Sequence, residues 1–172
     1  MPSCSDAYAE FFVETVSDAV VYAMQDLKET KMSTASSKAK NISFVRRYRM
    51  KDGSVATNPG VNNPNIDHVL FQPNETVKLL KLEREDGDDI FVVNFGTHAD
   101  TIGGEYISAD YSGFVCSTIE KALPGTKCMF LLGCEGDVNH VNVNPTKGES
   151  AITKIDFDGV PRGIKHSEHM VE

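Results

Sequence analysis

Residues 89–133 carry the feature that most constrains the fold: a buried strand, an amphipathic helix and a second buried strand. The first apolar run, 90–95, is rich in β-branched and aromatic residues. A helix-period segment follows and ends at Pro124-Gly125, before a second apolar run at 128–132. The apolar face of the helix is formed by Phe114, Val115, Thr118, Ile119 and Ala122. Because such crossovers are right-handed and join parallel strands, this stretch predicts a parallel βαβ unit.

The rest of the chain predicts a mixed sheet around this unit, and therefore an α/β fold. Alternating residues at 77–82 pair with 89–95 as an antiparallel hairpin across an acidic turn. The segment 57–67, rich in asparagine and proline, predicts a loop. Further strands are predicted at 31–40, which would lie at a sheet edge, at 41–50 and at 151–157.

A long helix is predicted near the N-terminus, capped by Ser5 or Asp6 and continuing to about Lys28. Its apolar residues recur at steps of three and four, and we expect this face to pack on a core. They are Tyr8, Phe12, Val16, Ala19, Ala23 and Leu27. Two helices are few for five or six strands, and 164–172 resembles the opening of a further helix. We therefore expect 1–172 to be one domain, the central fragment of a larger protein with polypeptide on both sides.

Composition excludes several functional classes. The net charge of −8 argues against a nucleic-acid partner, because phosphate binding needs a basic surface. No stretch reaches the roughly 18 apolar residues of a membrane-spanning helix. The four cysteines form no C-x-x-C pair or disulfide pattern, and the first residues do not form a signal peptide. If Met1 is the true start, these features favour the cytoplasm.

Polar side chains follow both strands of the βαβ unit. The carboxyl ends of parallel strands meet at one edge of the sheet, which is where open α/β sheets bind their ligands. We expect the following residues to gather there: His98, Asp100, Asp110, Cys134, Asp137, Asn139 and His140.

Several of these residues have more than one interpretation. His98 follows a strand among small residues, as a metal ligand would, although a histidine bonded to the backbone also fits. Asp110 suits a helix start, or it could accept a hydrogen bond from a metal-binding histidine. Cys134 lies between glycines, so a cysteine hydrolase using Cys134 and His98 is an alternative.

Arg46 and Arg47 are adjacent within the predicted strand 41–50, so their side chains point to opposite faces. One of them could grip a carboxylate, a phosphate or a developing oxyanion. Alternatively, both are solvated on an edge strand.

Four segments in this order resemble the neutral/alkaline (non-lysosomal) ceramidase family: NISFVRRYR, VVNFGTHAD, ISADYSGF and FLLGCEGDVNHVN. The resemblance implies a zinc-dependent amidohydrolase that cleaves the amide of an N-acyl sphingoid base or a similar lipid amide. It implies that His98 is a zinc ligand and that Arg46, or alternatively Arg47, is the family's arginine. Asp110 and Asp137 match acidic positions, and we expect them to support the site. Asn139 and His140, which we also expect to support it, stand where the family has serine and proline.

The chain also departs from this family. The family's other histidine ligand lies in a Thr-His-Thr-His segment ahead of the long helix, which this sequence lacks. The family's glutamate and tyrosine ligands would follow Glu172. We therefore expect catalysis only together with flanking segments. The alternative is a non-catalytic or degenerate fragment that binds or packs.

Overall fold

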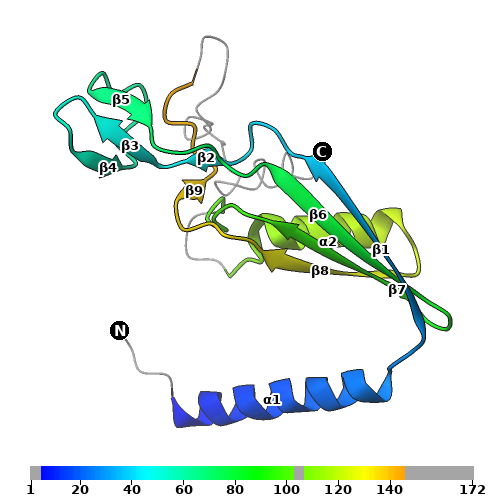
Figure 1. Ribbon diagram of the computed structural model, residues 1–172. Coiled ribbons are helices and arrows are strands. Elements are labelled where there is room, and N and C mark those ends of the chain that lie inside the picture. The colour runs from blue at the N-terminus through cyan, green and yellow to red at the C-terminus, as the bar shows by residue number, and fades with distance from the viewer. Residues whose placement is uncertain (1–4, 103–106, 146–172) are drawn as a thin grey trace, which may run out of the picture.

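The computed structural model describes residues 5–102 and 107–145, which form a mixed α/β fold (Figure 1). The helices are α1 (Asp6–Gln25) and α2 (Asp110–Ala122). The strands are β1 (Thr30–Lys38), β2 (Phe44–Val45), β3 (Arg47–Met50), β4 (Val55–Thr57), β5 (Ile66–Val69), β6 (Thr76–Arg84), β7 (Asp89–Phe95), β8 (Thr126–Leu132) and β9 (Val138–Asn139). The predicted strand 151–157 and helix 164–172 lie outside the described residues.

The main sheet has the order β1-β6-β7-β8. Strands β6 and β7 form the predicted antiparallel hairpin, β1 lies at the edge as predicted, and β7 and β8 are parallel. The register places Leu79, Val93 and Phe130 in one row across the sheet. Helix α2 packs on this row, where the Tyr111 and Phe130 rings meet edge to face at 5.4 Å. The predicted βαβ unit is thus confirmed, with α2 connecting its parallel strands.

The predicted single strand at 41–50 is wrong, because the chain changes sheets at Arg46. Before it, β2 pairs with β9, and after it, β3 pairs with β4 and β5. The Arg46 N–H donates to the Asp137 carbonyl at 2.9 Å, while the Arg46 carbonyl accepts from Asn58 N at 2.8 Å. The backbone groups of one residue therefore bond to two distant segments, which divides the strand.

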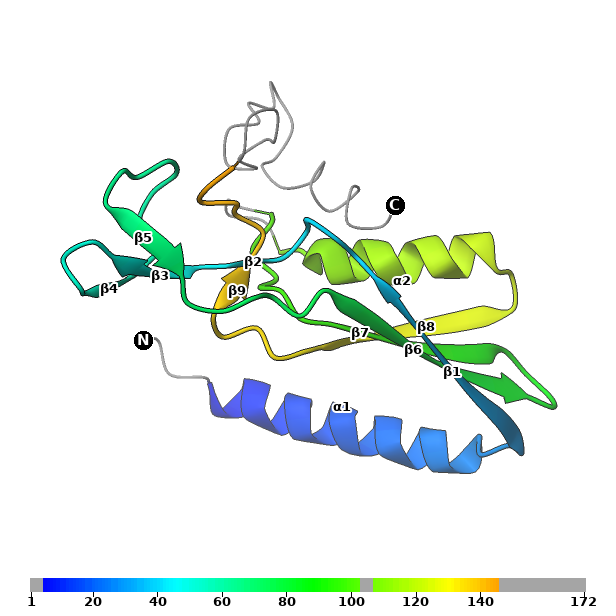
Figure 2. The same ribbon diagram turned by 45° about the horizontal axis from the view of Figure 1, so that its top comes forward.

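Helix α1 begins and ends close to its predicted bounds, with Ser5 as its N-cap accepting a hydrogen bond from Tyr8 N. The expectation that its apolar face is buried is wrong within the described residues. Phe12 is 56% exposed, and no residue of α1 is buried. Helices α1 and α2 lie on opposite sides of the main sheet (Figure 2).

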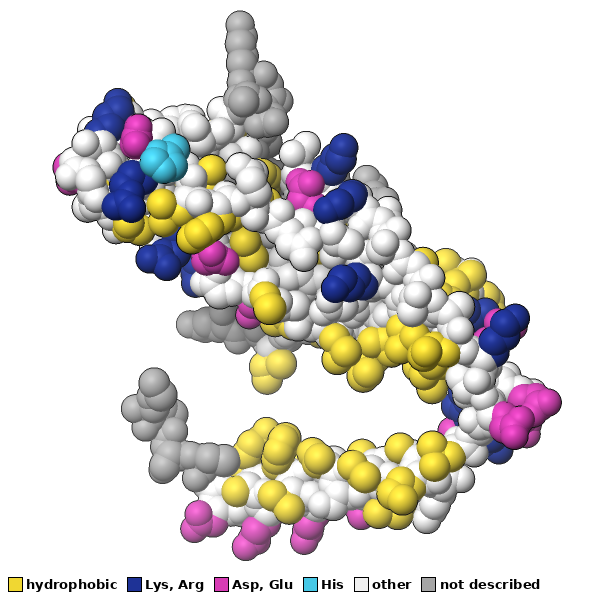
Figure 3. Space-filling model, in the orientation of Figure 1, with side chains coloured by type: hydrophobic (Ala, Val, Ile, Leu, Met, Phe, Trp, Pro, Cys, Tyr) yellow, Lys and Arg dark blue, Asp and Glu magenta, His cyan; other side chains and the backbone are white. Residues whose placement is uncertain are grey.

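The exposed face of α1 is turned toward the sheet, with acidic side chains on the far side of the helix (Figure 3). Its large apolar side chains are Tyr8, Phe11, Phe12, Val13, Val16, Val20, Val21, Tyr22 and Met24. Among the described residues the helix is secured near its C-terminal end, where Arg84 Nη2 lies 2.7 Å from the Asp26 carboxylate. In spite of this apolar face, neither described helix is long and apolar enough to cross a membrane.

Candidate functional site

The carboxyl ends of β7 and β8 meet through two glycines. Gly133 N donates to the Phe95 carbonyl at 2.9 Å. A Cβ atom on Gly96 would lie 2.6 Å from the Cys134 carbonyl oxygen, closer than real Cβ atoms come to another atom. Gly96 is therefore required for the two loops to approach each other, which brings the polar residues after each strand together.

His98 lies opposite Glu135 at this edge. The parallel register pairs Phe95 with Leu132, so the third residue beyond each strand is His98 on one side and Glu135 on the other. His98 Nδ1 is 3.7 Å from Glu135 Oε2, and both atoms are buried without a hydrogen-bond partner. Buried polar atoms are nearly always paired, so two unpaired ones facing each other make this edge the candidate site.

Glu135 was not among the residues predicted from the sequence. Its position relative to the end of β8 could have predicted it. His98 follows Phe95 by three residues, and Glu135 follows Leu132 by the same number. Because the two strands are parallel and in register, equal offsets predict neighbouring side chains.

Tyr111 holds the backbone next to His98. Its hydroxyl donates to the Thr97 carbonyl at 2.9 Å, and both residues are fully buried. Burial raises the pKa of Tyr111, and the charges of Glu135 and Asp110 raise it further, so the phenol stays a neutral donor. Thr97 Oγ1 is a third buried atom without a partner at this edge.

Asp110 is a support for the loop that follows His98. It lies 6% exposed at the start of α2, with a left-handed φ of 53° that strains a residue other than glycine. Its carboxylate accepts hydrogen bonds from Thr101 Oγ1 at 2.7 Å, Ile102 N at 2.8 Å and Tyr111 N at 2.7 Å. It thus joins the helix start to the loop, and in the part of the chain described here it bonds to no histidine.

A second histidine–carboxylate pair lies on the same edge. His140 Nδ1 is 3.0 Å from Asp100 Oδ1, within hydrogen-bond distance. Asn139 is directed elsewhere, since its amide donates to Asn58 Oδ1 at 3.2 Å and anchors the loop beyond β4. Asp137 contributes its backbone carbonyl, which accepts from Arg46 N.

The structure separates the two candidate arginines. Arg46 Nη2 donates to the Gly136 carbonyl at 2.8 Å, so its guanidinium lies on the loop that carries Glu135. Arg47 lies exposed on β3, in the sheet formed with β4 and β5, where it pairs with Thr57. Of the two, Arg46 is therefore the one brought to the candidate site.

Cys134 is exposed and forms no hydrogen bond with His98 within residues 5–102 and 107–145. A thiol nucleophile and its base lie within hydrogen-bond reach of each other, or slightly beyond it before substrate binds. The cysteine-hydrolase alternative therefore gains no support from this geometry. Instead, the Cys134 backbone carbonyl packs against Gly96.

The residues present fit a metal ion only in part. His98 has the chemistry of a ligand, and its side chain is 25% exposed at the end of the strand. Within the described ranges, however, no three His, Cys, Asp or Glu side chains are grouped as a metal site. A catalytic zinc site uses three protein ligands, so the described residues alone would not complete one.

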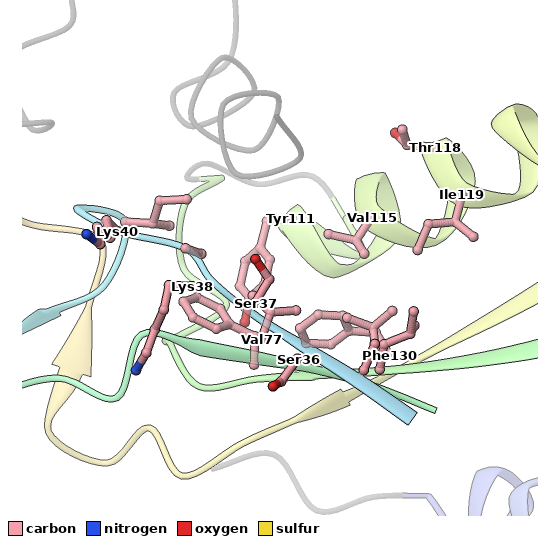
Figure 4. A pocket seen from close by; sticks show the side chains of 16 residues that line it. Ser36, Ser37, Lys38, Lys40, Val77, Tyr111, Val115, Thr118, Ile119 and Phe130 are labelled. Carbon is pink, nitrogen blue, oxygen red and sulfur yellow. The ribbon is translucent and has the colours of Figure 1, made fainter. Parts of the chain in front are cut away.

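A groove of about 580 Å³ lies beside α2, on the face of the sheet that this helix only partly covers. Tyr111, Val115 and Ile119 from α2 line one side, and Val77 and Phe130 from the sheet line its floor (Figure 4). Tyr111 belongs both to the groove and to the edge that carries His98. The groove is therefore an apolar surface that adjoins the candidate site.

No protein-family model and no curated protein matches the sequence. Solved structures similar to this chain include two of ceramidases. The neutral ceramidase from Pseudomonas aeruginosa matches with a TM-score of 0.55 and 15% identity, covering 88% of this chain and 23% of that one. A structure of ceramidase complexed with C2 matches with a TM-score of 0.54 and 14% identity, covering 87% of this chain and 22% of that one. The chain spans less than a quarter of the length of either structure. At these identities the likeness concerns the fold alone: the chain has a ceramidase-like fold.

Proposed function

We propose that this chain forms the central part of the catalytic domain of a zinc-dependent amidohydrolase, acting on the amide of an N-acyl sphingoid base or a related lipid amide. The observation that carries the proposal is the His98–Glu135 pair, whose facing atoms are buried and unpaired where two parallel strands end. The ceramidase-like fold supports the same reaction class.

The chain's own contribution to such a site is His98 together with the groups that position it. Its imidazole would hold the metal with ligands supplied by other parts of the polypeptide. Tyr111 and Asp110 fix the backbone before and after it through the Thr97 carbonyl and the Ile102 N–H. When bound, zinc lowers the pKa of a water to about 7 and polarises the carbonyl under attack.

Arg46 supplies positive charge at the same edge. A guanidinium has five N–H donors, and one of them is used on the Gly136 carbonyl. Because that bond fixes the orientation of the planar group, the remaining donors can hold a substrate oxygen without further ordering. We assign Arg46 to substrate or oxyanion binding, with Asp137 fixing its backbone.

The decisive test compares His98→Ala with the unchanged protein, in the polypeptide that carries this chain. Bound zinc is measured by atomic absorption, and amide cleavage is measured with a fluorescent N-acyl sphingoid base. We expect His98→Ala to lose its zinc and at least 100-fold of the rate, about 2.7 kcal/mol of transition-state stabilisation. His68→Ala is the matched control, because the His68 side chain is exposed on β5 and pairs with its neighbour Asp67.

Full zinc content and full rate in His98→Ala would overturn the proposal. Inactivation by a thiol-alkylating reagent, combined with indifference to chelators, would instead favour the Cys134 hydrolase. The two mechanisms predict opposite responses to the two reagents.

A second candidate function is a domain that binds or packs without catalysis. The apolar groove beside α2 and the exposed face of α1 favour it, since large apolar surfaces in soluble proteins mark interaction sites. This candidate predicts a stably folded chain that binds no zinc and hydrolyses no amide, both in the His98→Ala variant and without it.

A further inference from the structure

We propose that Glu135 is the positioning residue of His98: it accepts the proton on Nδ1 and so directs the Nε2 lone pair outward. The inference rests on the proposed function for the identity of the bound metal. The role of Glu135 concerns only the tautomer and orientation of the His98 imidazole. It is tested without metal, separately from the proposed function.

The register across β7 and β8 brings the two side chains together. Phe95 and Leu132 are paired, and the glycine that follows each strand lets the backbones touch. The loops therefore leave the sheet side by side, with the imidazole and the carboxylate facing each other at 3.7 Å. This separation is less than 1 Å longer than a charge-assisted hydrogen bond.

The two nitrogens of His98 lie in different surroundings. Nδ1 is buried and faces Glu135 Oε2. The His98 side chain as a whole is 25% exposed, so the part of the ring away from Nδ1 reaches the surface. The hydrogen bond made by one ring nitrogen decides which nitrogen carries the proton. A carboxylate at Nδ1 therefore leaves Nε2 free to bind a metal ion or accept a proton.

Two neighbouring donors are already engaged, and Glu135 Oε2 is the carboxylate oxygen that faces His98 Nδ1. The Tyr111 hydroxyl is used on the Thr97 carbonyl, and the His98 N–H is used on the Val138 carbonyl. A buried carboxylate oxygen that stays unpaired destabilises the folded state. A packing role alone does not explain an acidic side chain at this position, because an apolar residue would avoid that cost.

The experiment is a long-range ¹H–¹⁵N correlation spectrum of the ¹⁵N-labelled chain, recorded without metal at a pH where imidazoles are neutral. The spectrum distinguishes the Nδ1–H from the Nε2–H tautomer for each histidine, and His98→Gln identifies the signals of His98. The variants are Glu135→Ala and the conservative Glu135→Gln. Asp100→Asn is the matched control, because Asp100 pairs with His140 on the same edge. Backbone amide spectra of β7 and β8 show whether each variant keeps the fold.

We expect His98 to be mainly the Nδ1–H tautomer in the unchanged chain. Glu135→Ala should lose this signature, and Glu135→Gln should retain part of it, since its amide oxygen can still accept the proton. Asp100→Asn should alter His140 and leave His98 as it was. An Nε2–H tautomer of His98 in the unchanged chain, or an unaltered tautomer in a folded Glu135→Ala variant, would overturn the inference.

A zinc titration of the same samples separates this inference from the proposed function. We expect Zn²⁺ to shift the Nε2 resonance of His98, with an affinity 10- to 100-fold lower in Glu135→Ala, the usual loss when the partner of a metal-binding histidine is removed. If the tautomer depends on Glu135 but Zn²⁺ leaves Nε2 unaltered, the positioning role stands and the metal assignment fails. If Zn²⁺ binds at Nε2 with equal affinity in both proteins, the positioning role fails and the metal assignment stands.

Discussion

Where β6 turns into β7, the charged side chains of the sheet have partners. Lys81 Nζ lies 2.9 Å from the Asp89 carboxylate, and Arg84 Nη2 lies 2.7 Å from Asp26. At the opposite end, where β7 and β8 finish, polar side chains are buried and left without partners. They are Thr97 Oγ1, His98 Nδ1 and Glu135 Oε2. The turn end has one such atom among the described residues, Arg84 Nε, on a guanidinium already bonded through Nη2.

This contrast between paired and unpaired side chains distinguishes groups that stabilise the fold from groups that are candidates for function. A pair such as Lys81–Asp89 is complete by itself, and being partly exposed it adds little to stability. An unpaired buried atom costs free energy unless another group eventually meets it. We therefore place the function at the carboxyl edge, where buried polar atoms lack hydrogen-bond partners.

The largest effect is expected from closing the space between the two loops. In Gly96→Ala the new Cβ would meet the Cys134 carbonyl at 2.6 Å, and backbone atoms cannot swing aside as a side chain can. We expect the free energy of unfolding in urea to fall by about 3 kcal/mol. Gly136→Ala is the control: its Cβ would meet no atom within 4 Å, so a change within about 1 kcal/mol is expected. Equal losses in both variants would contradict the close approach at Gly96.

A smaller effect is expected from removing the hydroxyl that holds the backbone ahead of His98. Tyr111→Phe keeps the ring against Phe130 but leaves the buried Thr97 carbonyl without its donor. The expected loss is about 1–2 kcal/mol in the free energy of unfolding. Tyr8→Phe, which is on the exposed face of α1, should change it by less than about 0.5 kcal/mol. If Tyr111→Phe unfolds at the same urea concentration as the unchanged chain, the hydroxyl has no role in stability.

The sequence was sufficient for elements that depend on local patterns. The βαβ unit, the β6–β7 hairpin, the edge strand β1 and the bounds of α1 follow from periodicity, capping and turn residues. The division of 41–50 was not predictable in this way. It depends on bonds from Arg46 to Asn58 and Asp137, and the second of these is 91 residues away in the chain. Whether the apolar face of α1 is buried likewise depends on which segment packs against it. The periodicity of the helix does not specify that segment.

The candidate site divides in the same manner. Strand ends and parallel register were enough to predict that His98, Asp100 and His140 share an edge. The sequence did not decide between Arg46 and Arg47, because both lie in one predicted strand and periodicity does not show which of them faces the site. It also left out Glu135, whose significance appears only when β7 and β8 are aligned residue by residue.

The smallest effect is expected at the turn end, where the partners are complete. The hydrogen bond from Lys81 holds the pKa of Asp89 below its ordinary value. A carboxyl with a lowered pKa contributes stability above its unfolded pKa of about 3.9, and that contribution is lost as the pH falls through the folded value. The unchanged chain should therefore exceed Asp89→Asn in stability at pH 7 by a margin that shrinks toward pH 3.

Urea unfolding of both proteins at the two pH values measures this margin. Asp86→Asn is the control, since Asp86 is 91% exposed and reaches Lys28 only at 4.0 Å, so it should alter the unfolding free energy less at pH 7. A margin for Asp89 that stays constant from pH 7 to pH 3 would show that its carboxylate charge adds nothing. The contrast between the two ends would then rest on the carboxyl edge alone. There, Tyr111→Phe and Gly96→Ala are expected to lower the free energy of unfolding by more than Asp89→Asn does.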